Sequence, residues 1–244
     1  MSLLLGTLLL RPYVFLFLLA YLVAAVRDLG GRRTLIFTAS VWPVAFLAEF
    51  SSTRTGIPFG LYHYTGATRG QELFFSDVPF FDSLSFVFLA YAAWSLARRV
   101  MPTRRPVPLA VAAGALMMLL DVVIDPLAVR GDRWFLGRVF WYTDPGLYFG
   151  VPLSNFAGWW LVGAVGVGGY LALTARAGGA RVERLTLGVG LYYGVLAFNL
   201  LMTAWIREWS LLLTGVVVHT IVAIVLVRLA SSSAGFPRAI GAEV

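Results

Sequence analysis

Long apolar runs alternate along the chain with shorter runs of polar and charged residues. Seven apolar segments can be marked, at 12–26, 34–50, 79–97, 107–125, 152–174, 186–206 and 210–227. Several of them approach the roughly 20 residues that a helix needs to cross a lipid bilayer. The pattern therefore predicts an all-α, polytopic integral membrane helix bundle of about seven transmembrane helices, with residues 1–244 forming a single transmembrane domain.

The first of these segments is the least regular. Arg11 interrupts an apolar run that begins at Leu3. No signal-peptide cleavage pattern follows this run, so we expect it to be a retained helix rather than a processed segment.

The composition agrees with a membrane protein and excludes several functions. Hydrophobic residues make up 59% of the chain and charged residues 13%, and the mean hydropathy is +0.82. Cysteine is absent, which removes disulfides, thiolate metal sites and a cysteine nucleophile, and two histidines supply conventional zinc or haem sites poorly. All 19 basic residues are arginine, so a retinal protein, which needs a lysine Schiff base, is excluded.

The arginines are distributed unevenly between the two sides of the predicted bundle. If the helices alternate in direction, twelve of the 19 fall on one side, in the loops 27–33, 98–106 and 175–185 and the C-terminal tail. The positive-inside rule makes this side cytoplasmic and predicts a multi-pass protein of the cell membrane. This topology also explains the net charge of +7, so we expect a lipid bilayer and no nucleic acid as partner.

Polar groups gather at the opposite, non-cytoplasmic end of the bundle. Four predicted helices place an acid or an amide there, in a set made up of Glu49, Asp82, Asp121, Asp125 and Asn155. An ionisable residue inside a membrane costs about 2.5 to 3.5 kcal/mol at a helix centre, so it usually faces a partner or a cavity. The loops at this end, 51–78 and 126–151, are long and rich in aromatic and acidic residues, which is typical of functional loops.

Asp121 and Asp125 lie one helical turn apart and share a helix face. The deeper carboxyl, next to a second negative charge and away from water, is favoured to keep its proton, so we expect Asp121 to act as a general acid and Asp125 to orient water. Pro126 is expected to end the helix, because the residue before a proline is disfavoured in the helical conformation.

Simpler roles for these residues remain open. Each acid could be paired, Asp125 with Arg130 or Arg133, Glu49 with Arg54 and Asp82 with a loop group. Alternatively, the two aspartates could hold magnesium and a diphosphate. Tryptophan and tyrosine near helix ends could be interfacial anchors only, a group that includes Trp141, Tyr142, Trp159 and Trp160. Asn199, His219 and the glycines of 163–170 are expected to support helix–helix contacts.

Three stretches carry a more specific resemblance: PFGLYHYT at 58–65, LLDVVIDPLAV at 119–129 and YFGVPLSNFAGWW at 148–160. Their order and spacing resemble the CruF-type carotenoid hydratases, over about residues 40–174, with the last two helices similar by hydropathy only. The resemblance implies addition of water across the terminal double bond of an acyclic ψ-end, an acyclic or monocyclic carotenoid substrate, and no cofactor. The candidate positions inside the matching stretches are Tyr62, His63, Tyr64, Asp121, Asp125, Pro126, Asn155 and Phe156.

The chemistry that this resemblance implies fits the residues. Protonation of the alkene by a carboxylic acid gives a tertiary carbocation, which aromatic faces stabilise and water captures. We therefore expect the five polar residues to be catalytic and the aromatic residues to bind substrate, namely Tyr62, His63, Tyr64, Trp141, Tyr142 and Phe156. Two other functions stay open: a carotenoid end-group cyclase, which uses the same acid and cation, and a non-enzymatic protein that binds or transports a pigment or lipid.

Overall fold

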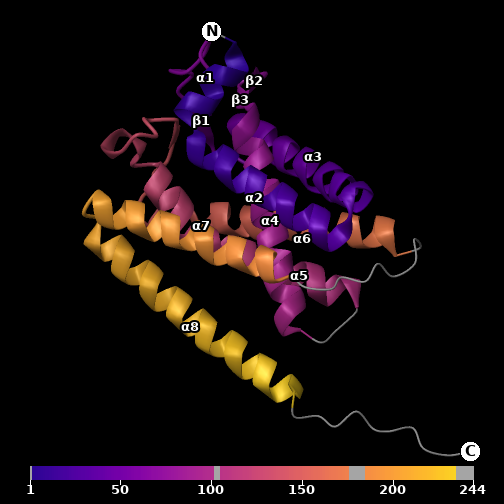
Figure 1. Cartoon of the computed structure of the whole chain (residues 1–244). Helices are drawn as coiled ribbons and strands as arrows, with labels where there is room; N and C mark the ends of the chain where they lie inside the picture. Colours follow the sequence, from indigo (N-terminus) through magenta and orange to yellow (C-terminus); the bar gives the residue numbers. More distant parts are fainter. Residues whose placement is uncertain (1, 102–104, 176–184, 235–244) are drawn as a thin grey trace, which may run out of the picture.

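The computed structural model describes residues 2–101, 105–175 and 185–234. This part of the chain contains eight α-helices, seven of which are long and apolar enough to cross a membrane (Figure 1). The predicted all-α polytopic bundle with seven spans is confirmed. The arginines at positions 104, 176, 181, 184 and 238, which count toward the predicted cytoplasmic side, lie outside the described residues.

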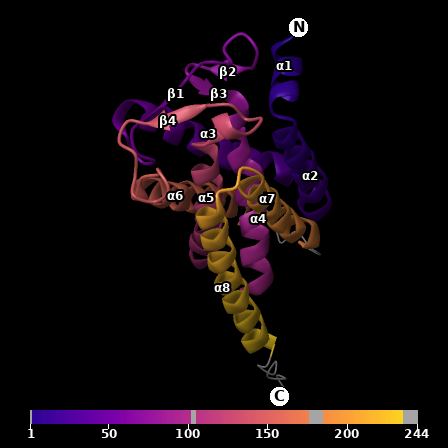
Figure 2. The same ribbon diagram turned by 90° about the vertical axis from the view of Figure 1, so that its left-hand side faces the viewer.

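The seven long helices follow the predicted apolar segments closely. They are α2 (Pro12–Leu29), α3 (Gly31–Thr55), α4 (Phe80–Val100), α5 (Pro106–Ala128), α6 (Leu153–Thr174), α7 (Thr186–Trp205) and α8 (Trp209–Ala234). Helix α4 is buried on all sides and packs against α2, α3, α5 and α7, whereas α8 extends away from the bundle along one side (Figures 1 and 2).

Glycines set the close approach of α5 and α6. A Cβ atom at Gly163 would lie 2.9 Å from the Cα of Gly114, and a Cβ at Gly114 would collide with the backbone of α6 at Trp160. A Cβ at Gly166 would meet Val41 of α3 at 3.1 Å. The expected role of the 163–170 glycines in close helix contact is therefore confirmed for these two positions.

The apolar run at the N-terminus is split into two helices. A short helix, α1 (Leu3–Leu10), ends at Arg11, whose backbone is not helical, and α2 begins at Pro12. Proline suits the first helical turn because its missing N–H has no intrahelical partner there. The interruption seen in the sequence is thus a true break, and it directs the Arg11 side chain into the protein, where it is 3% exposed.

Pro126 does not end its helix, so that expectation was wrong. Helix α5 continues to Ala128. A proline inside a helix cannot donate to the carbonyl four residues before it. Here the Tyr148 hydroxyl donates to that carbonyl, on Val122, over 3.2 Å, and this tertiary hydrogen bond replaces the missing one.

The two long loops form short strands that the sequence did not predict. β1 (Tyr62–Tyr64) pairs antiparallel with β4 (Phe140–Tyr142), and β2 (Phe74–Phe75) pairs with β3 (Val78–Pro79). Figure 2 shows β1 and β4 lying together across one end of the helix bundle. Segments that are far apart in the sequence therefore form one cap over the end where the acidic residues gather.

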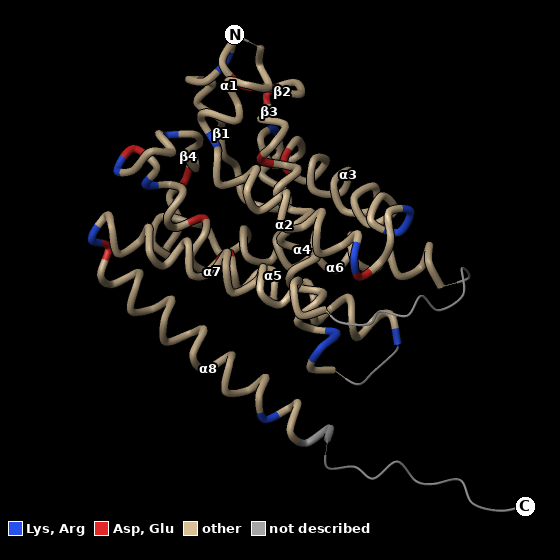
Figure 3. Tube along the Cα trace, viewed as in Figure 1, with Lys and Arg blue, Asp and Glu red and all other residues tan. Residues whose placement is uncertain are grey.

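Basic and acidic residues are placed differently along this bundle. Figure 3 shows the arginines at helix ends and in loops, while several acidic residues lie among the helices. Buried acids include Glu49, Glu72 and Asp121. The expected gathering of acids inside one end of the bundle therefore agrees with the fold, and the assignment of that end to the non-cytoplasmic side stays a prediction.

Candidate functional site

A cavity of about 140 Å³ lies beneath the β1–β4 cap. Four of the five polar residues singled out in the sequence line it: Glu49 from α3, Asp82 from α4, Asp125 from α5 and Asn155 from α6. The fifth, Asp121, is fully buried and lies behind the wall. The fold thus brings the predicted polar residues of four helices together.

Asn155 joins the two aspartates of α5. Its side-chain amide donates to Asp121 Oδ2 over 2.6 Å and to Asp125 Oδ2 over 2.8 Å. The two carboxyl groups also interact with each other directly, and the backbone N–H of Asp125 donates to Asp121 Oδ1. The three residues therefore form one hydrogen-bonded unit, of which Asp125 and Asn155 line the cavity.

Two further side chains hold Asp125. The Trp159 indole donates to Asp125 Oδ2 over 3.3 Å, and the Tyr142 hydroxyl donates to the same oxygen over 3.4 Å. Trp159 is buried and its ring stacks on Phe86, with ring centroids 4.4 Å apart. Tyr142 and Trp159 thus belong to the site and are not interfacial anchors only. Trp159 follows Asn155 by one helical turn on the same face of α6, a spacing in the sequence that could have linked the two residues.

Glu49 forms a second acidic position in the cavity wall. The Tyr64 hydroxyl donates to Glu49 Oε1 over 3.0 Å, while Oε2 is buried without a hydrogen-bond partner in the described part of the chain. Glu49 also interacts electrostatically with Asp82 and Asp125. A buried carboxyl oxygen without a partner in the wall of a cavity is suited to bind a water molecule or a reacting group.

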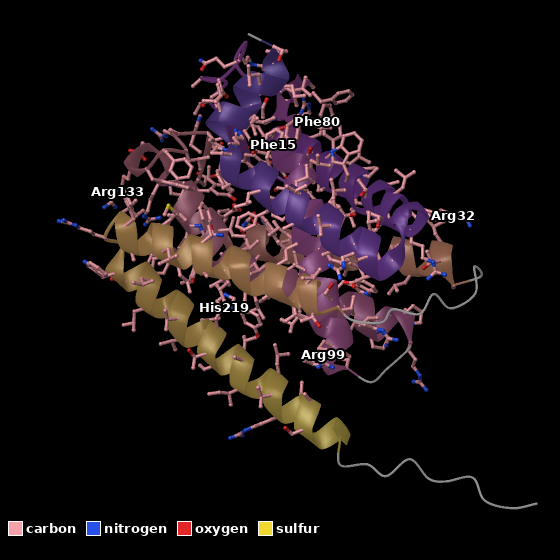
Figure 4. All side chains as sticks on the ribbon, viewed as in Figure 1. Phe15, Arg32, Phe80, Arg99, Arg133 and His219 are labelled. Atoms are coloured by element: carbon pink, nitrogen blue, oxygen red, sulfur yellow. The ribbon has the colours of Figure 1, made fainter. Side chains whose placement is uncertain are left out.

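The arginine pairs differ from those considered in the sequence. Arg54 pairs with Asp77 rather than with Glu49. Arg130 and Arg133 both pair with Glu208 rather than with Asp125 (Arg133 is labelled in Figure 4). Within the described ranges, no ion pair involves Glu49, Asp121 or Asp125.

Asp82, in contrast, is ion-paired, as one of the simpler readings of the sequence allowed, but the partners in this buried cluster were not predicted. Arg11 donates to both carboxylate oxygens of Glu72, over 2.6 and 2.9 Å, and to Asp82 over 2.5 Å. Thr68 donates a further hydrogen bond to Glu72. Burial alone would lower the pKa of Arg11, but the charges of Asp82 and Glu72 outweigh burial and raise it.

Alternate side chains of β1 and β4 point to opposite faces of the cap, and one set faces the cavity. Tyr62 and Tyr64 of β1, together with Phe140 and Tyr142 of β4, line the cavity. Burial, reinforced by nearby carboxyl groups, raises the pKa of Tyr62, Tyr64 and Tyr142 well above the usual range, so these phenols stay neutral hydrogen-bond donors.

Three residues expected to bind substrate do not line the cavity. His63 and Trp141 contact each other on the other face of the β1–β4 pair, with ring centroids 5.2 Å apart, because successive strand residues point to opposite sides. Phe156 packs edge-on against Tyr148 instead. The expectation that these three side chains contact substrate is therefore not supported by the cavity geometry.

The remaining polar residues within helices have separate roles. His219 of α8 hydrogen-bonds to the backbone of Leu119 in α5 and lies between α7 and α8 (Figure 4), which confirms an interhelical role. Asn199 donates to the carbonyl of Val195 within its own helix and also lines the cavity, so the interhelical hydrogen bond expected for it is not found among the described residues. Among the described residues, no group of three or more histidine or acidic side chains is arranged to hold a metal ion.

Comparison with known proteins decides the family. Residues 9–223 match the sequence profile of a family described as carotenoid biosynthesis protein. The chain belongs to this family. The match includes α7 and most of α8, so it extends the resemblance seen at residues 40–174 and confirms the resemblance to the CruF-type hydratases at the level of the family.

One curated relative is similar over much of the chain. The bisanhydrobacterioruberin hydratase of Haloarcula japonica is 32% identical over 163 residues, an alignment that covers 64% of this chain and 53% of the relative. The chain thus spans about half the length of the curated relative that it matches. No solved structure matches the chain.

Proposed function

We propose that this member of the carotenoid biosynthesis protein family is a hydratase of multi-pass topology in the cell membrane, its whole chain forming a single transmembrane domain. It adds water to the terminal C1–C2 double bond of an acyclic ψ-end, in an acyclic or monocyclic carotenoid. The observation that carries the proposal is the Asp121–Asn155–Asp125 unit in the wall of a cavity otherwise lined largely by aromatic rings. The hydratase name of the Haloarcula relative supports the choice of reaction.

The reaction needs one acid, one base and one water molecule. A carboxyl O–H bond breaks and its proton adds to the less substituted carbon of the alkene, leaving a tertiary carbocation at the other carbon. A lone pair of water then forms the new C–O bond. The resulting oxonium loses a proton to a carboxylate, which restores the protonation state of the site. No electrons are gained or lost overall, so the reaction consumes only the carotenoid and water.

The geometry favours Asp125 as the group that delivers the proton. Asp121 is 0% exposed and does not line the cavity, so the role expected for it in the sequence passes to its neighbour. Two adjacent carboxyl groups share one proton more readily than they carry two negative charges. We assign Asp121 and Asn155 the positioning of Asp125, through the amide that bridges both carboxyl groups.

Water is best placed at Glu49, which α3 contributes to the cavity wall. Glu49 offers an unpartnered oxygen there, and the Tyr64 hydroxyl orients its carboxyl group. Glu49 then receives the proton released by the oxonium, and exchange through water or Asp82 returns the site to its starting state. The acid and the base thus come from two different helices that face one cavity.

Aromatic faces suit the cationic intermediate. Phe86, Tyr62 and Trp159 line the cavity, and each ring face near a cation contributes about 0.5 to 2 kcal/mol. These rings do not trap the cation before water does. The indole N–H of Trp159 is engaged in a hydrogen bond to Asp125, and burial raises the pKa of the Tyr62 hydroxyl, which therefore stays a neutral, weak nucleophile.

The proposal is tested by expressing the protein in a bacterium that accumulates lycopene, followed by liquid chromatography and mass spectrometry. We expect a product heavier by one water. Asp125→Asn is expected to lower its yield by at least about 100-fold, as loss of a general acid does. Asp77→Asn, at a partly exposed ion pair that does not line the cavity, is the matched control and is expected to keep wild-type yield.

The other outcomes identify the alternatives. A product of unchanged mass with a ring chromophore would show a cyclase. Lycopene that binds to the purified protein and stays unaltered would show a pigment-binding protein. Either result, with the protein confirmed in the membrane by immunoblot, would refute the hydratase proposal.

A further inference from the structure

The cavity is too small for a whole carotenoid. Its volume of about 140 Å³ is close to that of an engineered cavity of about 150 Å³ that takes one benzene molecule. It can therefore hold an end group, while the long isoprenoid chain has to leave the protein through one of the cavity walls.

Three of those walls are unsuited to an apolar chain. Toward α5 and α6 the wall consists of the hydrogen-bonded Asp125 and Asn155, and above it lies the β1–β4 cap. Toward the α1–α2 break, the wall is the buried ion cluster of Arg11 with Glu72 and Asp82. Passage of the isoprenoid chain there would separate Arg11 from its two carboxylates in a buried environment, which costs several kcal/mol.

The wall between α2 and α7 is mostly apolar and one helix layer thick, and its polar side chain on α7, Asn199, has its amide engaged by the carbonyl of Val195. Val14 and Phe17 of α2 and Val195 of α7 line the cavity on this side. The neighbouring residues Leu16 and Leu201 on the same two helices are 63% and 66% exposed on the outside of the bundle, where they face lipid in a membrane. Figure 1 shows α2 and α7 on one side of the molecule, diverging toward the end where α2 begins and α7 ends.

Five aromatic side chains pack together where the two helices diverge. They are Tyr13, Phe17, Trp134, Phe135 and Phe198, here called the aromatic cluster. Phe198 is at its centre. Its ring stacks on Tyr13 at 5.1 Å with an interplanar angle of 16°, and contacts Phe17 at 5.6 Å and Trp134 at 6.3 Å. Tyr13, Phe17, Trp134 and Phe198 also line the cavity, so this cluster separates the cavity from the outer surface.

We infer that the aromatic cluster is the portal through which the linear polyene chain of the substrate passes from the bilayer into the cavity, between α2 and α7. The inference rests on the proposed function for the identity of the chain. The end group reaches the acids, and the remaining polyene lies against the rings of Tyr13 and Phe198, whose flat faces match a flat conjugated chain.

Trp134 can turn without breaking a side-chain hydrogen bond, whereas the Tyr13 hydroxyl is held by Arg11 and stays in place. The indole N–H of Trp134 is buried without a hydrogen-bond partner in the residues described. The segment that leads to Trp134 is held by two arginines. Arg130 donates to the carbonyls of Pro126 and Phe149, and Arg133 donates to that of Ile206. A ring rotation therefore opens the portal while the loop stays attached to α5 and α7.

The absence of cysteine allows a direct test. The variant Phe17→Cys/Phe198→Cys places thiols on the two sides of the portal, and a membrane-permeant, reductively cleavable bis-thiol crosslinker joins them. Carotenoid uptake by the purified protein in lipid vesicles is followed by quenching of tryptophan fluorescence, since Trp134 and Trp159 line the cavity. We expect crosslinking to slow uptake at least about tenfold relative to the same untreated variant, and reduction to restore it.

The matched control crosslinks α2 elsewhere. Phe15 of α2 (labelled in Figure 4) and Phe81 of α4 have ring centroids 4.5 Å apart, away from α7. Crosslinked Phe15→Cys/Phe81→Cys is expected to keep the uptake rate of the untreated protein. Uptake that persists after crosslinking α2 to α7 would overturn the portal.

A single variant is expected to change the uptake rate in the opposite direction to the crosslink, and loss of folding would not produce faster uptake. Phe198→Ala removes the central ring and is expected to speed uptake, so unchanged or slower uptake in folded protein contradicts the inference. The assay also separates the two proposals. Uptake that depends on the portal without any hydrated product refutes the hydratase alone, while hydration unaffected by the crosslink refutes the portal alone.

Discussion

Replacing Arg11 by methionine removes the guanidinium that contacts both Glu72 and Asp82. The side chains of Arg11 and Glu72 are 4% and 0% exposed, so water cannot replace the lost hydrogen bonds of Glu72. Asp82 is 20% exposed and is partly relieved by solvent, so most of the effect falls on Glu72.

The expected loss follows from the burial of the carboxylate. Breaking a buried ion pair by removing one partner costs about 3 to 5 kcal/mol, because the other charge stays buried. For a domain of this size each kcal/mol moves the melting temperature by about 2 to 4 °C, so Arg11→Met is expected to melt about 6 to 20 °C below wild type. Adding Glu72→Met removes the stranded charge, so the double variant is expected to be more stable than Arg11→Met alone.

Thermal unfolding of the protein in detergent, followed by tryptophan fluorescence, measures both variants. Two results would refute the reasoning. Arg11→Met could melt within about 2 °C of wild type, which would mean that the cluster contributes little. Alternatively, the losses of stability caused by Arg11→Met and Glu72→Met could simply add in the double variant, which would mean that Arg11 and Glu72 do not act as a pair.

Three further predictions follow from local contacts. Gly114→Ala is expected to lose about 1 to 3 kcal/mol because its methyl group meets the backbone of α6, whereas Gly168→Ala, with ordinary contact distances, stays near wild type in the same melting assay. Trp141→Ala leaves the yield of hydrated product within about twofold of wild type, since its ring points away from the cavity; a large loss of product would contradict this orientation. Partial burial raises the pKa of Asp77, but the hydrogen bond and charge of Arg54 outweigh it and lower the pKa. The pair therefore stabilises the protein at neutral pH, by about 0.2 to 1 kcal/mol at this exposed site. The difference in melting temperature between wild type and Arg54→Met should shrink by this contribution as acid protonates Asp77, which melting at several pH values checks.

The helices could be predicted from the sequence because bilayer thickness fixes their length and apolar runs mark them. The gathering of Glu49, Asp125 and Asn155 could be predicted for the same reason, since alternating helices bring every second helix end to the same side. Depth along each helix was thus readable, while the direction of each side chain was not.

His63 and Trp141 differ from the residues next to them in the direction of their side chains, which point away from the cavity. Both lie in three-residue strands, too short to show an alternating pattern in sequence, and the pairing of β1 with β4 joins segments nearly eighty residues apart. Once the pairing is known, the period of two assigns Tyr62 and Tyr142 to the cavity and their neighbours to the outside.

Arg11 illustrates a different obstacle. The charge was visible as an interruption of an apolar run, but its partners follow 61 and 71 residues later, in a loop and in α4. Nothing local distinguishes Glu72 from the other loop acids. Only the fold of α1 against that loop, where Thr7 accepts the backbone N–H of Leu73, brings the partners together.

The hydrogen bond between Tyr148 and Val122 has a consequence for biosynthesis. Helix α5 is synthesised and can enter the bilayer before Tyr148 is made, 26 residues after Val122. Until then the Val122 carbonyl lacks a donor, and an unsatisfied buried carbonyl costs about 1 to 3 kcal/mol. The hydrogen bonding of α5 is therefore complete only when the loop that carries Tyr148 folds back onto the helix. Assembly of this end of the protein then follows the order of translation.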